Sequence, residues 1–232
     1  MNRLAIIPAR GGSKRIPDKN IRAFCGRPMI AHTLDAARES RLVATIHVST
    51  DSAAIAEVAA EHGYPPAFPR PAALADDHTP IMPVLRHAVE RFAEGGAHFD
   101  EIWLLIACAP LTTAADLKGA ATLYAASDGD RALLAVSEYP APVEWAFRRD
   151  VDGGLAPLQP GAFAIRSQDL EKRYFDAGCF AVFPPSRVRA SEGAGHDADF
   201  VGYVLPRGSS VDIDDEDDWA LAEALYRARR RG

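Results

Sequence analysis

Two observations predict an α/β fold for this chain, with helices covering a mostly parallel central sheet in a Rossmann-like arrangement. Short apolar runs alternate with longer stretches of helical period, which is the pattern of parallel βαβ units. The chain has 232 residues, of which 48% are hydrophobic and 25% are charged, so it can bury the core of one large domain. We therefore expect residues 1–232 to form a single domain.

Strands and helices are expected to alternate as far as residue 136. The helices are predicted from apolar side chains at helical spacing, such as Val84, Leu85 and Ala88, and from Pro28 and Ser52, which are typical of helix starts. The strands are predicted from short apolar runs. In chain order we expect a strand at 4–8, a helix from 28, a strand at 45–49, helices at 53–62 and from 79, a strand at 102–107, a helix at 116–126 and a strand at 132–136.

This rhythm changes between about residues 140 and 200. Prolines, aromatic residues and broken apolar runs replace the alternation, and Gly153 and Gly154 indicate a hairpin. About 60 residues are few for an independent domain, so we expect this insertion to pack on the parent sheet or to reach a partner subunit. A strand at 201–205 and a helix at 216–229 complete the expected fold.

Composition excludes several classes of protein. The net charge of −6 argues against a general nucleic-acid binder. Cys25, Cys108 and Cys179 lie far apart, so they indicate neither a disulfide framework nor a zinc site. The apolar run at the N-terminus is too short for a signal peptide, and no stretch approaches the ~20 apolar residues of a membrane span. We expect a cytoplasmic protein with no membrane or nucleic-acid partner.

The loop after the first strand is the clearest indication of function. Residues 6–20 read IIPARGGSKRIPDKN. The adjacent Gly11 and Gly12 let backbone N–H groups approach an anion, and four cations offer charge-assisted donors to the same anion. The spacing matches neither a Walker-type P-loop nor a dinucleotide fingerprint, so we expect a triphosphate cradle of another kind. Its cations are Arg10, Lys14, Arg15 and Lys19.

A second candidate site lies before the last helix. In an extended segment, Asp212 and Asp214 point to one face while Ile213 turns into the core. Paired carboxylates suit Mg²⁺, which would bridge them to substrate phosphates. The alternative is that the acidic run complements a helix N-terminus, and we assign the four acids at 215–218 mostly to that role.

These motifs resemble those of the cytidylyltransferases that activate 2-keto sugar acids as CMP-sugars, among them the N-acylneuraminate and pseudaminic acid synthetases. The resemblance covers nearly the whole chain. It implies a nucleotidyltransferase fold and the transfer of CMP from CTP to the anomeric hydroxyl of a nine-carbon 2-keto acid, with Mg²⁺ as cofactor and pyrophosphate as product. After the loop at 6–20, the similar segments are GRPMI at 26–30, VSTD at 48–51, RP at 70–71, LADD at 74–77, RSQDL at 166–170, DAG at 176–178 and DID at 212–214.

The nucleotide half of the expected site combines both motifs. We expect Arg10 and Lys19 to neutralise the phosphates on one side, and Mg²⁺ on Asp212 and Asp214 to do so on the other. The resemblance implies that Arg70 and Asp77 contact the cytosine base and ribose, with a solvated surface arginine as the alternative for Arg70. The expected nucleotide-binding residues are Ala9, Arg10, Gly11, Gly12, Ser13, Lys19, Asn20, Arg70 and Asp77.

The acceptor half is expected to draw on the insertion. The resemblance implies that Arg166, Gln168 and Asp169 bind the sugar acid, and that the insertion forms a homodimer interface that completes each acceptor site. The alternative is a surface ion pair between Asp169 and Arg173. Sialic acid synthetases carry a glutamine where this chain has Ile106. An apolar side chain suits a less hydroxylated acceptor, which favours pseudaminic acid over N-acetylneuraminic, legionaminic or 3-deoxy-octulosonic acid.

A function of another class stays open. A nucleotide-sensing or scaffold domain would keep the fold without the chemistry. The retained pair Asp212 and Asp214 favours the enzyme.

Overall fold

The structure, a computed structural model that describes residues 1–127 and 131–230, confirms the predicted α/β fold. Within these residues, six strands form one sheet in the order β10-β6-β9-β5-β1-β4 once they are numbered along the chain. The antiparallel strand β9 lies between β5 and β6, and the other pairings are parallel. The strands are β1 (Arg3–Pro8), β4 (Thr45–Ser49), β5 (Glu101–Leu105), β6 (Ala132–Glu138), β9 (Tyr174–Phe183) and β10 (Phe200–Val204).

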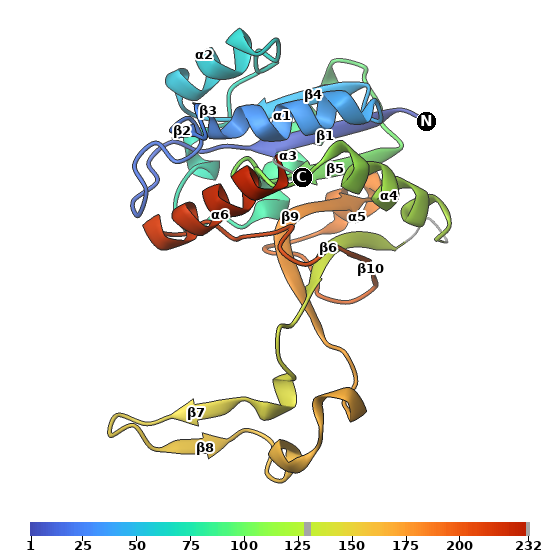
Figure 1. Cartoon of the computed structure of the whole chain (residues 1–232). Coiled ribbons are helices and arrows are strands. Elements are labelled where there is room, and N and C mark those ends of the chain that lie inside the picture. Colours follow the sequence, from blue (N-terminus) through green and yellow to red (C-terminus); the bar gives the residue numbers. More distant parts are fainter. Residues whose placement is uncertain (128–130, 231–232) are drawn as a thin grey trace.

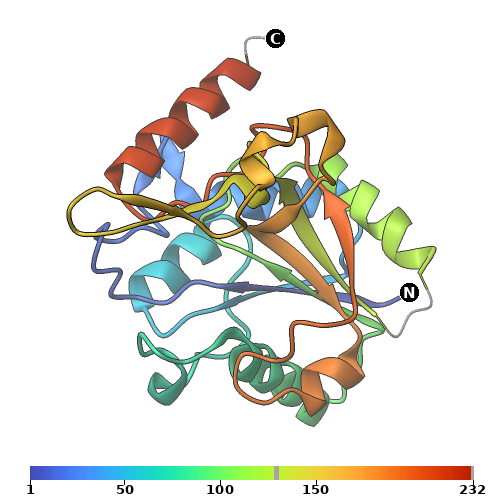
Figure 2. The same ribbon diagram turned by 90° about the horizontal axis from the view of Figure 1, so that it is seen from below.

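Helices cover both faces of this sheet (Figures 1 and 2). In β1, Ala5 and Ile7 join the core on one face, whereas Leu4 and Ile6 join the core on the other. Burial on both faces is why the strands show continuous apolar runs. No helix among the described residues is long and apolar enough to cross a membrane. The first face is covered by α1 (Met29–Ser40), α2 (Ala53–Glu61) and α4 (Ala114–Ala125), and the second by α3 (Ile81–Glu94) and α5 (Pro185–Ala190).

A third, smaller core lies at the end of the sheet where α6 packs. Ile16 from the loop after β1 and Ile213 from the segment before α6 contact Phe24 and Trp219. The rings of Phe24 and Trp219 meet edge to face, with centroids 5.5 Å apart. This core therefore joins the two segments that carry the predicted site. Its elements are α6 (Glu216–Arg229) and the hairpin of β2 (Ala23–Phe24) and β3 (Arg27–Pro28).

The segment that leaves the sheet is shorter than the insertion expected at about 140–200. The chain returns at residue 174 as β9, and α5 then packs beside α3. Residues 139–173, which we call the arm, extend away from the sheet (Figure 1). The alternation of strands and helices in the sequence predicts parallel βαβ units. An antiparallel strand such as β9 needs no crossover helix, so this alternation could not indicate it.

The arm contains the hairpin predicted from the paired glycines. Its two short strands pair antiparallel, and Gly153 at the turn has a φ of 90°. A left-handed φ is one that glycine adopts without strain. The strands are β7 (Phe147–Arg149) and β8 (Leu155–Pro157).

Candidate active site

Most of the predicted nucleotide residues lie in the loop after β1, at the carboxyl edge of the parallel strands, whereas Arg70 and Asp77 lie in the segment between α2 and α3. The loop after β1, residues 9–20, is the cradle predicted from the sequence, and we keep that name for it. Asp51 follows β4, and Ile106 and Cys108 follow β5. In an open α/β sheet this edge is where ligands bind.

The cradle is fastened to the end of β4. The Ala9 N–H donates to the Ser49 carbonyl at 2.9 Å, and the Gly11 N–H donates to Asp51 Oδ1 at 2.9 Å. A Cβ on Gly11 would come within 3.3 Å of the Ser52 side chain, so a larger residue would push the cradle away from β4. Asn20 Nδ2 donates to the Arg10 carbonyl at 3.1 Å and closes the loop on itself.

All four cations of the cradle pair with carboxylates from other parts of the chain. Arg10 Nη1 lies 2.6 Å from Asp77 Oδ1, and Lys14 contacts the same carboxylate. These two cations hold the pKa of Asp77 below its usual value. The second carboxylate is Asp214, which pairs with Arg15 at 2.8 Å and with Lys19 at 3.8 Å.

The structure confirms that Ile213 turns into the core between the two predicted metal ligands. Ile213 is 0% exposed, and its carbonyl accepts a hydrogen bond from Lys19 Nζ at 2.6 Å. Burial and the charge of Asp214 raise the pKa of Asp212, and Asp176 acts in the same direction. A cation between these carboxylates would relieve their repulsion.

The donor set here is typical of a metal shared with a substrate. Mg²⁺ is usually held by one or two carboxylates together with phosphate oxygens and water. Among residues 1–127 and 131–230, no group of three or more His, Cys, Asp or Glu side chains could hold a metal. Asp212 and Asp214 therefore fit Mg²⁺ that arrives with a triphosphate, and they do not form a closed protein site.

Arg70 lies in the interior rather than on a solvated loop. It is 6% exposed, and its guanidinium donates to Ser49 Oγ at 3.1 Å and to the Ser49 carbonyl at 2.5 Å. Burial lowers the pKa of Arg70 to about 10, so it stays protonated at neutral pH. The strand that fastens the cradle therefore also holds Arg70.

A mostly apolar cavity of about 360 Å³ opens beside Asp176, and we call it the β9 cavity. Ile106 packs against the core that forms its inner wall, and Thr33 Oγ1 donates to the Ile106 carbonyl at 3.0 Å. Ile106 itself does not line the cavity. The lining of the cavity includes Ile81, Met82, Leu104, Ala181, Phe183 and Gly195.

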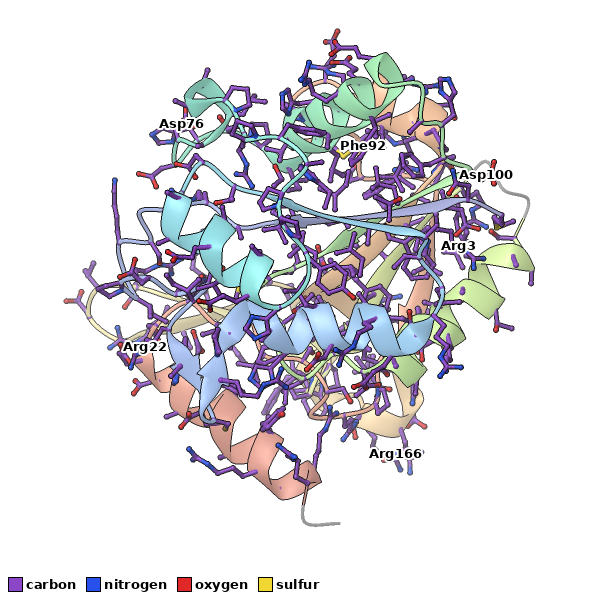
Figure 3. All side chains as sticks on the ribbon, turned by 90° about the horizontal axis from the view of Figure 1, so that it is seen from above. Arg3, Arg22, Asp76, Phe92, Asp100 and Arg166 are labelled. Carbon is purple, nitrogen blue, oxygen red and sulfur yellow. The ribbon has the colours of Figure 1, made fainter. Side chains whose placement is uncertain are left out.

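The predicted acceptor residues of the arm do not reach the cradle within one chain. Arg166 lies on the arm, far from Asp76 at the edge of the cradle (Figure 3). Arg166 Nε pairs with Asp169 Oδ2 at 2.7 Å. The alternative pair of Asp169 with Arg173 is wrong, because Arg173 pairs with Glu144 at 3.2 Å.

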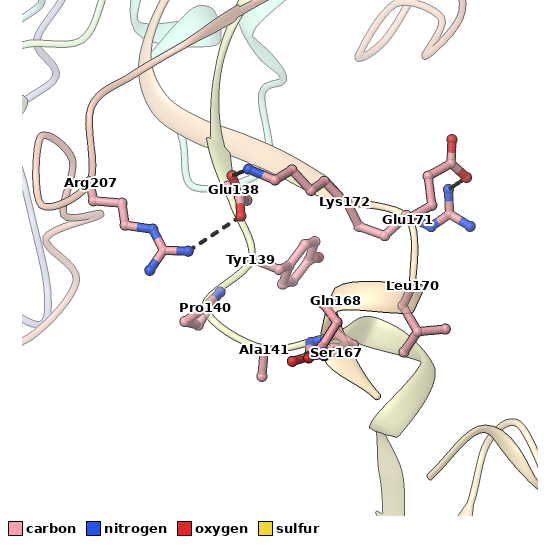
Figure 4. A pocket seen from close by; sticks show the side chains of 12 residues that line it. Glu138, Tyr139, Pro140, Ala141, Ser167, Gln168, Leu170, Glu171, Lys172 and Arg207 are labelled. Atoms are coloured by element: carbon pink, nitrogen blue, oxygen red, sulfur yellow. Dashed lines mark hydrogen bonds and ion pairs between the residues drawn. The ribbon is translucent and has the colours of Figure 1, made fainter. Parts of the chain in front are cut away.

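Gln168 lines a different pocket, at the root of the arm (Figure 4). This pocket has a volume of about 310 Å³. Glu138 lines this pocket and pairs with Lys172 at 2.9 Å and with Arg207 at 3.3 Å. A single chain thus separates Gln168 from Ile106, with which it was expected to act.

Three residues of the site were not among the predicted ones. Asp51 fastens Gly11, and Asp176 borders both Asp212 and the β9 cavity. Asp51 follows a predicted strand directly, which is a signal that sequence reasoning could have used. Asp176 stands in the DAG segment at 176–178 that resembles the family, but no role was assigned to it because its strand was not predicted. Cys108 is the third, and burial raises the pKa of its thiol beside Lys19.

Comparison with known proteins agrees with this geometry. A family model described as "Cytidylyltransferase" matches residues 4–90. A pseudaminic acid cytidylyltransferase of Campylobacter jejuni is 35% identical over 98% of this chain and 97% of its own length. A CMP-N,N'-diacetyllegionaminic acid synthase of Legionella pneumophila is 30% identical over 97% of this chain and 96% of its own.

Solved structures share the fold at low sequence identity. A CMP:2-keto-3-deoxy-manno-octonic acid synthetase in complex with CTP has a TM-score of 0.72 at 15% identity, over 99% of this chain and 100% of that one. A 4-diphosphocytidyl-2C-methyl-D-erythritol synthase of Anaerococcus prevotii has a TM-score of 0.61 at 13% identity, over 97% and 96%. With sequence relatives at 30% identity or more over almost their full length, the chain belongs to the cytidylyltransferase family.

Proposed function

We propose that the protein transfers CMP from CTP to the anomeric hydroxyl of a nonulosonic acid, with pseudaminic acid favoured. The hydroxyl oxygen forms a bond to the α-phosphorus, and the bond from that phosphorus to the bridging oxygen breaks. Pyrophosphate leaves with the electron pair, and the hydroxyl proton passes to water. The observation that carries this proposal is the meeting of the cradle cations with Asp214 beside the buried Ile213.

The cradle is proposed to bind the triphosphate. Arg10 and Lys19 would neutralise phosphate oxygens, and the N–H groups around Gly11 and Gly12 would donate to them. Arg70 would bind the cytosine base and Asn20 the ribose or a phosphate, since both are held next to the cradle. Catalysis by positioning and charge neutralisation needs such fixed groups. Asp77, which was expected at the base and ribose, pairs with Arg10 and Lys14 instead, so we assign it no contact with the nucleotide.

Mg²⁺ is the proposed cofactor, and Asp212 and Asp214 would hold it. The metal supplies neutralisation of the charge that develops on the leaving pyrophosphate. Lys19 keeps a fixed positive charge next to Asp214, and the buried Ile213 orients both carboxylates.

The acceptor is proposed to lie between Ile106 and the β9 cavity. The apolar part of the cavity lining would take acyl or deoxy substituents of the sugar, since hydroxyl groups against it would lose hydrogen bonds. Its polar lining, which includes Arg187 and His196, would face the polar groups of the sugar. The apolar lining supports pseudaminic acid, and the pseudaminic acid cytidylyltransferase at 35% identity supports it independently. Legionaminic acid is the alternative that the relative of Legionella pneumophila favours.

A homodimer is proposed to complete the acceptor site through the arm. The arm exposes large apolar side chains, among them Phe163 at 67% and Leu158 at 63%. Exposed apolar patches of this kind mark protein interfaces. Arg166, Gln168 and Asp169 would then reach the acceptor in the partner subunit.

The three free cysteines suit the reducing cytoplasm as the compartment of the protein.

The experiment that tests this function measures pyrophosphate release from CTP and Mg²⁺ with a panel of nonulosonic acids. We expect release with pseudaminic acid at the highest kcat/KM, and loss of release in Asp212→Asn with an unchanged circular dichroism spectrum. Asp217→Asn, in the first turn of α6, is the matched control and should keep activity. If no acid supports release, the proposed enzymatic function is refuted.

A further inference from the structure

Residues 71–80 join the nucleotide side of the site to the acceptor side, and we call them the bridging segment. At one end, the Arg70 N–H donates to the Thr50 carbonyl at 2.8 Å. At the other end the segment leads into α3, whose Leu85 and Ala88 are fully buried. Between these anchors none of its residues is buried. Little apolar area thus holds the segment in place, so it can shift at low cost.

Asp76 and Asp77, two neighbouring acids of the bridging segment, make different contacts. Asp76 Oδ1 accepts hydrogen bonds from the N–H groups of His78 at 2.9 Å and Thr79 at 2.6 Å, and from Thr79 Oγ1 at 2.8 Å. Asp76 therefore builds the local turn. The carboxylate of Asp77 points instead to the cradle, where it contacts Arg10 and Lys14.

Asp77 holds cations that CTP would need. A phosphate oxygen would compete with the Asp77 carboxylate for the N–H donors of Arg10 and Lys14 that face it. The side chain of Lys14 is 79% exposed, that of Arg10 38% and that of Asp77 33%, and ion pairs between exposed side chains are weak because water screens them. A triphosphate offers more charge and more acceptor oxygens, so it would displace the carboxylate readily.

The far end of the same segment borders the acceptor. Ile81 and Met82, the first two residues of α3, line the β9 cavity. Met82 Cγ lies only 3.1 Å from the place where a Cβ on Gly195 would be, so Met82 and the loop at Gly195 are in tight contact. Only three residues separate Asp77 from Ile81 along the chain, and two of them, His78 and Thr79, are held in the turn that Asp76 builds.

We propose that Asp77 is an internal competitor for the triphosphate site, and that its displacement by CTP couples nucleotide binding to the β9 cavity. This inference rests on the proposed function. Coupling between two ligands is reciprocal, so the nucleotide strengthens acid binding by the same factor as the acid strengthens nucleotide binding. The complex with both substrates bound therefore forms at lower substrate concentrations than it would if the two sites were independent.

Calorimetric titration of the full chain with CTP and with inorganic tripolyphosphate tests the competition. We expect Asp77→Asn to bind both probes about fivefold more tightly than the wild type, because the competing carboxylate loses its charge. Glu57→Gln, which removes one charge from an exposed site on α2, should change either affinity less than about twofold. Equal or weaker binding by Asp77→Asn overturns the competition.

The coupling has its own readout. Pseudaminic acid is titrated without Mg²⁺, with and without tripolyphosphate. In the wild type tripolyphosphate should tighten acid binding several-fold, whereas in Asp77→Asn the acid should bind tightly already and gain less. An equal gain in both proteins overturns the coupling. Absence of CTP binding by the wild type would instead refute the proposed function, so the two failures are distinguishable.

Discussion

Lys19 occupies the point where the two halves of the site meet. Its ammonium donates to the Ile213 carbonyl at 2.6 Å and lies 3.8 Å from Asp214, although 194 residues separate Lys19 from Ile213. Its side chain is 18% exposed, so the charge is partly shielded from solvent and its electrostatic effect is stronger than that of a surface lysine. Lys19 therefore both fixes the carboxylate segment and supplies charge to the site.

The buried His47 in β4 makes the unfolding free energy depend on pH. It is 1% exposed, its Nδ1 has no hydrogen-bond partner among the described residues, and burial lowers its pKa to about 4. The His47 side chain takes up a proton near pH 6.5 in the unfolded chain, but only near pH 4 in the folded chain. The contribution of the neutral His47 side chain to the unfolding free energy is fully present above pH 6.5 and is therefore lost as the pH falls toward 4.

Between pH 7 and pH 5 we expect His47 to cost the wild type about 2 kcal/mol of unfolding free energy. Urea unfolding at both pH values measures this loss. His47→Phe, which can pack between Phe68 and Phe92, should not show it, whereas the exposed control His98→Gln should behave as the wild type. An identical pH dependence in His47→Phe and the wild type would contradict the assignment.

The loop after β1, the β2–β3 hairpin and α6 act together through the third core. Ile16 and Ile213 come from the two segments that hold the cations and the carboxylates, and both are fully buried against Phe24. A shared apolar core fixes their relative position more firmly than the exposed ion pairs of Arg15 and Asp214 can.

Truncation of this core should therefore reduce catalysis as well as stability. Ile213→Ala is expected to lower the unfolding free energy by about 2–5 kcal/mol and to lower kcat, because Asp212 and Asp214 lose their fixed orientation. The matched control Ile55→Ala, in α2, should lose comparable stability but keep kcat. Unfolding curves and initial rates measure both quantities. Equal losses of kcat in the two variants would refute a positioning role.

The whole molecule consists of a closed α/β body and an arm that leaves it (Figure 1). Arg166 and Asp169 lie on this arm, away from the cradle, yet the resemblance assigns them to the acceptor. A second copy of the chain would resolve this separation, since in a two-fold dimer the arm of each subunit can reach the body of the other.

Mixing two inactive variants tests this arrangement. Arg166→Ala and Asp212→Asn should each be inactive, and subunits exchanged between them should recover about a quarter of the wild-type activity, because a mixed dimer has one intact site. No recovery after verified exchange would show that each site is built from one chain. Light scattering measures the assembly directly: Phe163→Glu should yield monomers, and Leu221→Glu, on the exposed face of α6, should not.

Local patterns in the sequence determined most of the helices and strands, the cradle, and the flanking of buried Ile213 by two acids. These features depend on periodicity and on residue types within short segments, which the chain carries directly. The tertiary structure alone decided that β9 enters the sheet antiparallel, that the arm spans 139–173, and that Asp77 and Asp214 pair with the cradle. Such contacts depend on how distant segments pack, and packing leaves no local period in the sequence.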